Sequence, residues 1–445
     1  MPQIPIELLN SLQHKHDIDV SAFIGAHDSE HKITSIRLNQ NKPANLTFEL
    51  YKPVLWNSNA FYLGERPYFT YDPLFHAGCY YVQEAGSMFI EHVLNELNFD
   101  KSNVAVLDAC AAPGGKSTLL NNYLNEDSLL ISNEFIKNRA DILAYNLSKW
   151  GSCNSIVTNC DTTKFLNLPD FFDLVLVDAP CSGSGLFRKQ PDAVEHWSEK
   201  AVKECSMRQK EILENLSSSV KPGGYLLYST CSYSSEENEN ISQWLIEEQN
   251  FILKKININK NWGIVESEYG YRFYPHLTES EGFYISIFQK EESDHYSSSK
   301  LKKTNLAAPT KAEKKVIAEF LRNNEDLFKI NQFLYKGNEK MFEFLSNYGS
   351  GFYIKKAGTC IGEMKGKDLV PNHELALSNY LSEHVRSIEL NLDESLQFLK
   401  KESFQKTNIA TGLTLIRHKT HGIGWCKFLP NRMNNYLPNE YKIMH

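Results

Sequence analysis

The sequence predicts an α/β fold built on a mainly parallel sheet with helices on both faces. Between residues 100 and 290, short apolar runs alternate with helical patterns. The runs are also almost continuously apolar, which is typical of strands that are buried on both faces of a parallel sheet. Ligands of such sheets bind beyond the carboxyl ends of the strands, so residues at those ends are the candidate site residues.

We expect six strands and two long helices in this part of the chain. The expected strands cover residues 104–108, 129–134, 155–158, 174–178, 225–229 and 283–288. The expected helices cover residues 136–150 and 197–220, and Lys221-Pro222-Gly223-Gly224 closes the second helix. Proline and glycine together are a typical helix stop.

The length of 445 residues is enough for two or three domains, each with its own core. The composition, 42% hydrophobic and 23% charged, is that of a folded globular protein. The first residues do not resemble a signal peptide and no apolar run is long enough for a membrane span, so we expect a cytoplasmic protein. The nine cysteines are scattered without a Cys-x-x-Cys pair, which argues against a metal site and against a disulfide framework.

Charge is distributed unevenly along the chain, whose net charge is −7. Residues 301–445 hold 22 Lys and Arg against 15 Asp and Glu, whereas residues 1–300 hold 25 against 39. A basic C-terminal third fits a module that meets phosphates, although a chance imbalance of surface charge would look the same. The polar, Ser- and Lys-rich stretch 291–313 is predicted to be a linker.

A glycine-rich loop, Asp108-Ala-Cys-Ala-Ala-Pro-Gly-Gly-Lys116-Ser-Thr, follows the strand 104–108 and opens a helix. Backbone N–H groups at such a helix start face a bound ligand. A phosphate loop would need glycine where the chain has Cys110, and the pattern Gly-x-Gly-x-x-Gly does not occur here either. The loop therefore suits a nucleoside without a phosphate, and a purely structural turn is the alternative.

Two acidic residues at strand ends are candidate contacts for that nucleoside. Glu134 ends the second strand about 20 residues beyond the glycines, where a carboxylate can accept hydrogen bonds from both ribose hydroxyls. Asp161 follows the third strand, where a carboxylate could accept from an adenine amino group. Either acid could instead cap the next helix, and for Asp161 this alternative is nearly as good.

Two cysteines also lie directly after strands of the expected sheet. Cys181 belongs to Asp178-Ala-Pro-Cys181, after the buried strand Phe172–Asp178, and Cys231 belongs to Ser229-Thr-Cys231. A purely structural cysteine has no reason to lie at these ends. Two thiols, an acid and a nucleoside loop at one crevice form a constellation that points to catalysis.

This set of groups suits methylation of cytosine at carbon 5. That carbon is too electron-poor to attack a sulfonium methyl group until a thiolate adds to carbon 6. A carboxyl group near nitrogen 3, for which Asp178 is the candidate, helps the ring to accept electrons. After methyl transfer the proton on carbon 5 must leave, and a second thiol could assist that step.

The segments DACAAPGGKST, NEFIKNRADIL, VLVDAPCSGSGLFRK and LLYSTCSYSSEENE resemble the Sun-type (nucleolar-protein-related) RNA cytosine-5 methyltransferases. The paired Pro-Cys and Thr-Cys motifs are specific to that group. The resemblance implies a Rossmann-like sheet that uses S-adenosylmethionine, with Cys231 as the nucleophile and Cys181 as the thiol that promotes release. DNA cytosine-5 methyltransferases attack with the Pro-Cys cysteine and have no Thr-Cys partner.

The resemblance also implies a set of cofactor contacts, to which Arg139 is a possible addition. The set is Cys110, Ala111, Ala112, Pro113, Gly114, Gly115, Lys116, Glu134, Asp161 and Asp178.

The resemblance extends to both flanks of the catalytic region. Residues 35–42 and 71–89 look like the N-terminal RNA-contacting region of the family and its junction with the fold. Two C-terminal segments, GEMKGKDLVPNHELALS and GIGWCKFLPNRMNNYLP, look like the bacterial small-subunit ribosomal RNA branch, which carries a PUA-like module. The predicted division is an N-terminal α+β region 1–75, a catalytic domain 76–290, a linker 291–313 and a C-terminal PUA-like α+β region 314–445.

The sequence therefore predicts an S-adenosylmethionine-dependent RNA (cytosine-5-)-methyltransferase that acts on 16S ribosomal RNA through a Cys231 adduct. A transfer RNA substrate, or a non-catalytic RNA-binding ribosome assembly factor, are the alternatives; the intact thiols and Asp178 count against the second. The expected partner is ribosomal RNA, free or in an assembling small subunit. We expect a monomer that binds neither membrane nor DNA.

Overall fold

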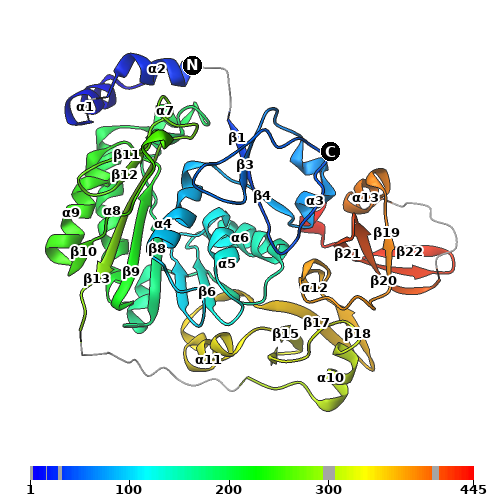
Figure 1. Ribbon diagram of the computed structural model, residues 1–445. Coiled ribbons are helices and arrows are strands. Elements are labelled where there is room, and N and C mark those ends of the chain that lie inside the picture. Colours follow the sequence, from blue (N-terminus) through cyan, green and yellow to red (C-terminus); the bar gives the residue numbers. More distant parts are fainter. Residues whose placement is uncertain (1–3, 17, 29–32, 294–305, 403–409, 445) are drawn as a thin grey trace.

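The computed structural model describes residues 4–16, 18–28, 33–293, 306–402 and 410–444 (Figure 1). Most of the linker predicted at 291–313 falls on residues 294–305 and so lies outside the described residues, as do residues 1–3 and 29–32 of the predicted N-terminal region. Within the described ranges, no helix combines the length and the apolar character that a bilayer crossing requires.

The centre of the molecule is a sheet of ten strands, counted over the described residues, in the order β11-β12-β13-β9-β8-β5-β6-β7-β16 with β10 beside β13. These strands are β5 (Ala105–Asp108), β6 (Leu129–Asn133), β7 (Ser155–Thr158), β8 (Phe172–Asp178), β9 (Val220–Thr230), β10 (Phe251–Leu253), β11 (Val265–Glu266), β12 (Tyr271–Phe273), β13 (Phe283–Lys290) and β16 (Ile354–Ala357). The five strands β5 to β9 pair in parallel, which confirms the predicted α/β class. Residues 283–288, expected in the same sheet, lie in β13, which pairs with both β9 and β12 in antiparallel fashion.

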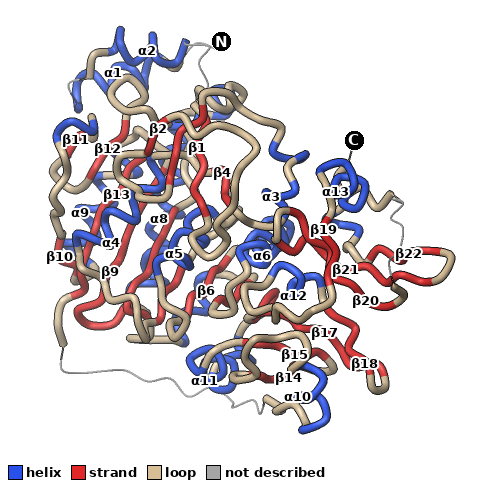
Figure 2. Tube along the Cα trace, turned by 45° about the vertical axis from the view of Figure 1, so that its right-hand side comes forward, coloured by secondary structure: helices blue, strands red, loops and turns tan. Residues whose placement is uncertain are grey.

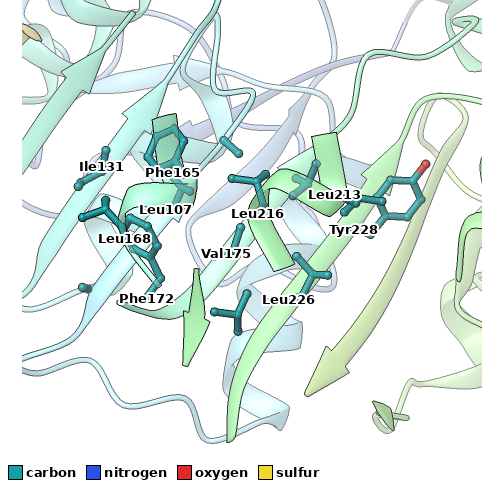
Figure 3. Close-up of a cluster of buried hydrophobic side chains, with 14 of the residues drawn as sticks. Leu107, Ile131, Phe165, Leu168, Phe172, Val175, Leu213, Leu216, Leu226 and Tyr228 are labelled. Atoms are coloured by element: carbon teal, nitrogen blue, oxygen red, sulfur yellow. The ribbon is translucent and has the colours of Figure 1, made fainter. Parts of the chain in front are cut away.

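Helices cover both faces of this sheet, as predicted. They are α4 (Ile90–Glu96), α5 (Gly115–Tyr123), α6 (Lys137–Trp150), α8 (Glu199–Ser217) and α9 (Glu239–Glu248). The short helix α7 (Ala193–His196) packs instead in a separate apolar cluster with Phe187 and Tyr233. Successive strand residues point to opposite faces, so Val106 packs with α4 and α5 whereas Leu107 packs with α8 and α9. Figure 3 shows the second of these clusters, with Leu213 and Leu216 of α8 beside the strands. Burial of each such side chain contributes roughly 1.5–3 kcal/mol to stability.

The boundary between α8 and β9 differs from the sequence prediction. The helix expected at 197–220 ends at Ser217, and β9 begins at Val220, so the Pro-Gly-Gly stretch lies in the strand and not at a helix end. Gly223 has a φ of +72° there, which glycine adopts without strain. The pairing of β8 with β9 shifts register between Phe172 and Leu174, so the irregular stretch is accommodated as a bulge before the regular pairing starts.

In its described residues, the N-terminal region contains three helices and a small antiparallel sheet in the order β2-β3-β1-β4. Its elements are α1 (Ile6–His16), α2 (Val20–Asp28), β1 (Thr34–Leu38), β2 (Lys52–Pro53), β3 (Ala60–Leu63), α3 (Pro73–His76) and β4 (Tyr80–Val82). Arg37 of β1 is buried and donates to Gln83, to the hydroxyl of Thr118 at 2.6 Å and to the carbonyl of Gly115. Lys42 is buried too, and its ammonium donates hydrogen bonds to three backbone carbonyls. These two basic side chains brace the start of α5 and the end of α6 and are not exposed to a nucleic acid.

The C-terminal region forms two further sheets, β14-β15-β17-β18 and β19-β20-β21-β22. Its elements are α10 (Lys311–Ile317), β14 (Leu327–Ile330), β15 (Phe333–Lys336), α11 (Glu339–Asn347), β17 (Thr359–Lys365), β18 (Asp368–Pro371), α12 (His373–Leu377), β19 (Ser387–Glu389), α13 (Leu392–Leu399), β20 (Gly412–His418), β21 (His421–Leu429) and β22 (Arg432–Asn435). Figure 2 shows β20, β21 and β22 on the opposite side of the molecule from β9 and β10. The last sheet packs on the N-terminal sheet through one shared apolar cluster.

One part of the C-terminal region extends the central sheet. β16 pairs with β7 in antiparallel fashion and extends the sheet at that edge. Helix α11 and the residues after it add Phe344 and Phe352 to the same apolar cluster as Leu107. The ring of Phe344 lies 5.9 Å from that of Phe171 and 5.6 Å from that of Phe352, centroid to centroid. The chain thus returns to the catalytic core after the stretch predicted as a linker.

The buried aromatic of α11 gives the first prediction. Phe344 is 1% exposed, so we expect Phe344→Ala to lower the free energy of unfolding by about 3–5 kcal/mol, through lost burial and the cavity left behind. Phe342→Ala is the matched control, because Phe342 lies on the same helix but is 43% exposed; its effect should stay within about 0.5 kcal/mol. Urea unfolding followed by circular dichroism measures both, and equal midpoints for the two variants would contradict a shared core.

Candidate active site

A cavity of about 570 Å³ opens at the carboxyl ends of the parallel strands, where the sequence predicts the site. Its lining includes seven of the twelve predicted residues: Cys110, Ala112, Glu134, Asp161, Asp178, Cys181 and Cys231. The other five lie outside the lining, in or beside the loop that starts α5: Ala111, Pro113, Gly114, Gly115 and Lys116.

The two predicted thiols lie in contact. Strands β8 and β9 pair in parallel with Asp178 opposite Ser229, so the loops that follow them leave the sheet side by side. The sulfur of Cys181 lies 3.0 Å from the sulfur of Cys231, and both residues are partly buried. The hydrogen bond to Cys231 and, next, burial raise the pKa of the Cys181 thiol well above its usual value. The raised pKa favours the thiol form of Cys181, which can donate a hydrogen bond to the sulfur of Cys231.

An ion pair lies beside the thiols. The ammonium of Lys116 is 2.7 Å from Oδ2 of Asp178, and the hydroxyl of Ser229 donates to Oδ1 of Asp178 at 2.9 Å. Burial alone would lower the pKa of Lys116, but the charge and hydrogen bond of Asp178 outweigh it, with a smaller contribution from Cys231, and the net pKa is raised. A permanent positive charge thus lies next to the thiol pair.

The glycine-rich loop is held by side chains from α6. Gly114 has a φ of +115°, a backbone conformation that favours glycine, and α5 begins at the next residue. Asn146 donates to the carbonyl of Pro113 at 2.7 Å and Arg139 donates to the carbonyl of Ala112 at 2.8 Å. These two hydrogen bonds from α6 therefore hold the carbonyl groups of the loop at the cavity wall. The conformation of the loop thus does not depend on a bound ligand.

The two predicted acids differ in their surroundings. Glu134 is buried, with Oε1 accepting from the backbone N–H of Ile136 at 2.8 Å and Oε2 lying 3.5 Å from the guanidinium of Arg139. Asp161 is exposed, and its carboxylate caps the short 3₁₀ helix Thr162–Asn167 by accepting from Thr163. These hydrogen bonds lower the pKa of Asp161, so it carries a negative charge at the cavity edge.

Several lining residues were missed by the sequence analysis. Phe135 and Ile136 follow Glu134 directly, are exposed apolar side chains and form part of the wall. Their position immediately after a strand-end acid is a signal that could have revealed them. Arg208 and Glu211 reach the cavity from α8, and no local pattern in the sequence marks which face of that helix meets the site.

Comparisons with known proteins agree with this geometry. The family model for 16S rRNA methyltransferase RsmB/F matches residues 94–289, the model for the N-terminal domain of 16S rRNA methyltransferase RsmF matches residues 4–85, and the model for the methyltransferase RsmF PUA domain matches residues 385–443. Ribosomal RNA small subunit methyltransferase F of Aliivibrio fischeri is 30% identical over 376 residues, which cover 82% of this chain and 79% of that protein. The chain belongs to the RsmB/F family of 16S rRNA methyltransferases.

Solved structures share the fold of this RsmB/F family member. A methyltransferase homologue from Pyrococcus horikoshii has a TM-score of 0.53 and 26% identity, and the match covers 64% of this chain and all of that one. NSun6 from Pyrococcus horikoshii, solved with SFG, has a TM-score of 0.55 at 19% identity over 65% of this chain and 99% of that one. The second likeness shows the fold alone.

Membership of the RsmB/F family confirms three predictions from the sequence: the Rossmann-like fold class, RNA methyltransferase activity and S-adenosylmethionine as the cofactor. The matched PUA domain spans α13 and the sheet β19-β20-β21-β22, which also confirms the predicted PUA-like module.

The thiol pair gives the second prediction. Cys231→Ala removes the hydrogen bond that does most to raise the pKa of Cys181, so that pKa should fall and more of Cys181 should be thiolate at a given pH. Alkylation of Cys181 by iodoacetamide at pH 8, followed by peptide mass spectrometry, should then be faster than in the wild type. Cys205→Ala, which removes a nearby thiol not bonded to Cys181, should leave the rate unchanged. An unaltered rate in Cys231→Ala would show that the two sulfurs are not coupled.

Proposed function

We propose that the protein methylates carbon 5 of a cytosine in RNA, through a covalent bond between Cys231 and carbon 6. The observation that supports this most is the contact of two thiols, 3.0 Å apart, in a cavity that also presents Glu134 and Asp178. Methyl transfer to a nitrogen or an oxygen needs no thiol nucleophile, whereas carbon 5 of cytosine needs one. One thiol would suffice for the attack on carbon 6. The presence of a second thiol therefore implies a further chemical step in which that thiol acts.

The surroundings of Cys231 fit a nucleophile. Its sulfur lies 3.0 Å from that of Cys181, within hydrogen-bonding distance, and the Lys116–Asp178 ion pair lies beside it. The thiolate is the reactive form of cysteine, and a hydrogen-bond donor and a cation next to the sulfur are the surroundings that a nucleophilic cysteine needs. Cys231 then forms the bond to carbon 6, the electron pair moves toward nitrogen 3, and carbon 5 becomes nucleophilic. Asp178, held by Lys116 and Ser229, is assigned to the polar edge of the ring.

The surroundings of Cys181 fit a group that acts after methyl transfer. While Cys231 is free, its hydrogen bond and charge keep the pKa of Cys181 high and Cys181 protonated. Once Cys231 is bonded to carbon 6, its sulfur is a neutral thioether and these effects end. Cys181 can then lose its proton to solvent and take the proton from carbon 5. The electron pair of that C–H bond restores the double bond, and the bond between carbon 6 and Cys231 breaks.

The cavity also fits S-adenosylmethionine, which supplies an electrophilic methyl group when bound. We assign the carboxylate of Glu134 to the ribose hydroxyls, that of Asp161 to the adenine amino group, and the residues from Cys110 to Lys116 to the wall of the cofactor site. Phe135 and Ile136 give an apolar surface for a purine. The cavity is lined by four carboxylates and two arginines, and this excess of negative charge disfavours phosphates but suits hydroxyl, amino and cationic groups.

We propose that the RNA substrate is the ribosomal RNA of the small subunit. Relatives that share most of their length with this chain are named for that substrate. We propose that residues 1–75 and 314–445 flank the catalytic domain 76–290 and contact the RNA as it assembles with ribosomal proteins. We also propose that the protein works as a monomer in the cytoplasm.

Cofactor binding is tested by calorimetry with S-adenosylmethionine and with ATP. We expect binding of the first and negligible binding of the second, because the cavity is acidic and the loop has Cys110 where a phosphate loop has glycine. Glu134→Ala should weaken S-adenosylmethionine binding by about 10- to 100-fold, the worth of hydrogen bonds to a charged group. Glu248→Ala, an exposed acid on α9, is the control. ATP binding without S-adenosylmethionine binding would refute the assignment.

The roles of the two thiols are tested by one denaturing gel of enzyme incubated with small-subunit RNA and S-adenosylmethionine. Cys231→Ala should transfer no methyl group and form no adduct. Cys181→Ala should attack and methylate but fail to release, which leaves a slow-migrating, protease-sensitive species. An adduct that persists in Cys231→Ala and disappears in Cys181→Ala would reverse the roles, and a protein that only binds RNA would form no adduct in either variant.

A further inference from the structure

A buried carboxylate, that of Glu237, lies between the loops that carry the two thiols. Glu237 ends the 3₁₀ helix η5 (Ser235–Glu237) and has no exposed surface. Its Oε1 accepts from the backbone N–H of Ser182 at 2.8 Å and from the amide of Gln209 at 3.1 Å. Its Oε2 accepts from the hydroxyl of Ser182 at 2.5 Å and from the hydroxyl of Ser232 at 2.6 Å. One carboxylate thus bonds the residue that follows each cysteine.

These bonds act where the pairing of the strands has ended. The last paired residue of β8 is Asp178, so Cys181 lies in the loop beyond the sheet, where the backbone N–H of Gly185 donates to the carbonyl of Cys231 at 2.8 Å. The hydroxyls of Ser182 and Ser232 lie 3.2 Å apart and meet on the same carboxylate oxygen. Gln209, which donates to that carboxylate, also donates to the carbonyl of Pro180 at 3.0 Å. Glu237 therefore connects the residues before and after Cys181 with the loop of Cys231: Pro180 through Gln209, and Ser182 directly.

The charge of Glu237 is unusual for its position. In the part of the chain that the structure describes, its four donors are all neutral: a peptide N–H, two hydroxyls and an amide. Burial of an ionised carboxylate without a cation opposes folding even when its oxygens are hydrogen-bonded. All four hydrogen bonds run toward Glu237, which fits a carboxylate that holds its neighbours in place.

That charge acts on the neighbouring thiol. The groups that face Cys181 are Cys231 from the β9 loop and Glu237 from η5, and the wall of the same cavity also carries Asp178 and, from α8, Arg208 and Glu211. After the hydrogen bond to Cys231, burial and the charge of Cys231, the charge of Glu237 is the next cause that raises the pKa of Cys181. Glu237 thus favours the thiol form of Cys181, the form that donates to Cys231.

We propose that Glu237 is a positioning residue for the thiol pair: through Ser182 and Ser232 it holds the two cysteine loops in contact. The proposal rests on the thiol roles given under the proposed function. Glu237 lies outside the cavity lining and acts only through its neighbours.

Glu237→Gln tests the charge with nearly unchanged shape, since the amide keeps one acceptor oxygen. We expect its melting temperature and its affinity for S-adenosylmethionine to stay those of the wild type, and kcat for methyl transfer to fall by about 10- to 100-fold, the worth of the charged hydrogen bonds. Ser232→Ala removes one of the four bonds and should lower kcat less. Glu248→Gln, the same change at an exposed acid of α9, should have no effect.

The alkylation rate of Cys181 is a second readout. It would not change in Glu237→Gln if Glu237 had only a structural role. Because Glu237→Gln removes a charge that raises the pKa of Cys181, iodoacetamide should modify Cys181 several-fold faster at pH 8 than in the wild type. A variant with wild-type alkylation and wild-type kcat would overturn the proposal. The proposal would also be overturned if the loss of kcat in Glu237→Gln and in Ser232→Ala were fully explained by a lower melting temperature of each variant.

The alkylation rate is measured without RNA, so it separates this inference from the proposed reaction. If wild-type protein methylates no cytosine but Glu237→Gln still accelerates alkylation of Cys181, the proposed function fails and the positioning of the thiols stands. If the wild type methylates cytosine while Glu237→Gln changes neither alkylation nor kcat, the proposed function stands and the positioning role fails.

Discussion

The parallel pairing of β8 with β9 is the constraint on which the rest of the site depends. With Asp178 opposite Ser229, both strands end at the same level and the loops after them start side by side. A slip of one residue would turn every side chain of one strand to the other face, and the buried residues of β8 would then face the wrong layer. The register is therefore fixed by the core, and the position of Cys181 relative to Cys231 follows from it.

Much of this arrangement could be predicted from the sequence, because it depends on local patterns. The buried strands β5 to β8 are short apolar runs, and each was placed within two residues of its observed bounds. The rule that ligands bind beyond strand ends then identified the acids and thiols that line the cavity. The start of β9 was misplaced because Pro222 and Gly223 look the same in a bulged strand as in a helix stop.

The features that could not be predicted all depend on contacts between distant segments. Arg37 looks like a residue for phosphate contact, yet it is buried against α5, and only the fold shows what covers it. Glu237 lies in a run of acidic and polar residues that looks like an exposed loop, although it is completely buried. Such residues break the usual link between polarity and exposure, and hydrogen bonds from far along the chain compensate for their burial.

The strand β16 has a consequence for how the protein is made. The ribosome synthesises β5 to β9 first, and Ala357, the last residue of β16, much later. Until then the outer edge of β7 carries unpaired N–H and C=O groups, which can pair with the edges of other nascent chains. The nascent polypeptide thus holds the residues that line the cavity on an unfinished sheet, and translation of the C-terminal region adds the strand that covers the edge of β7.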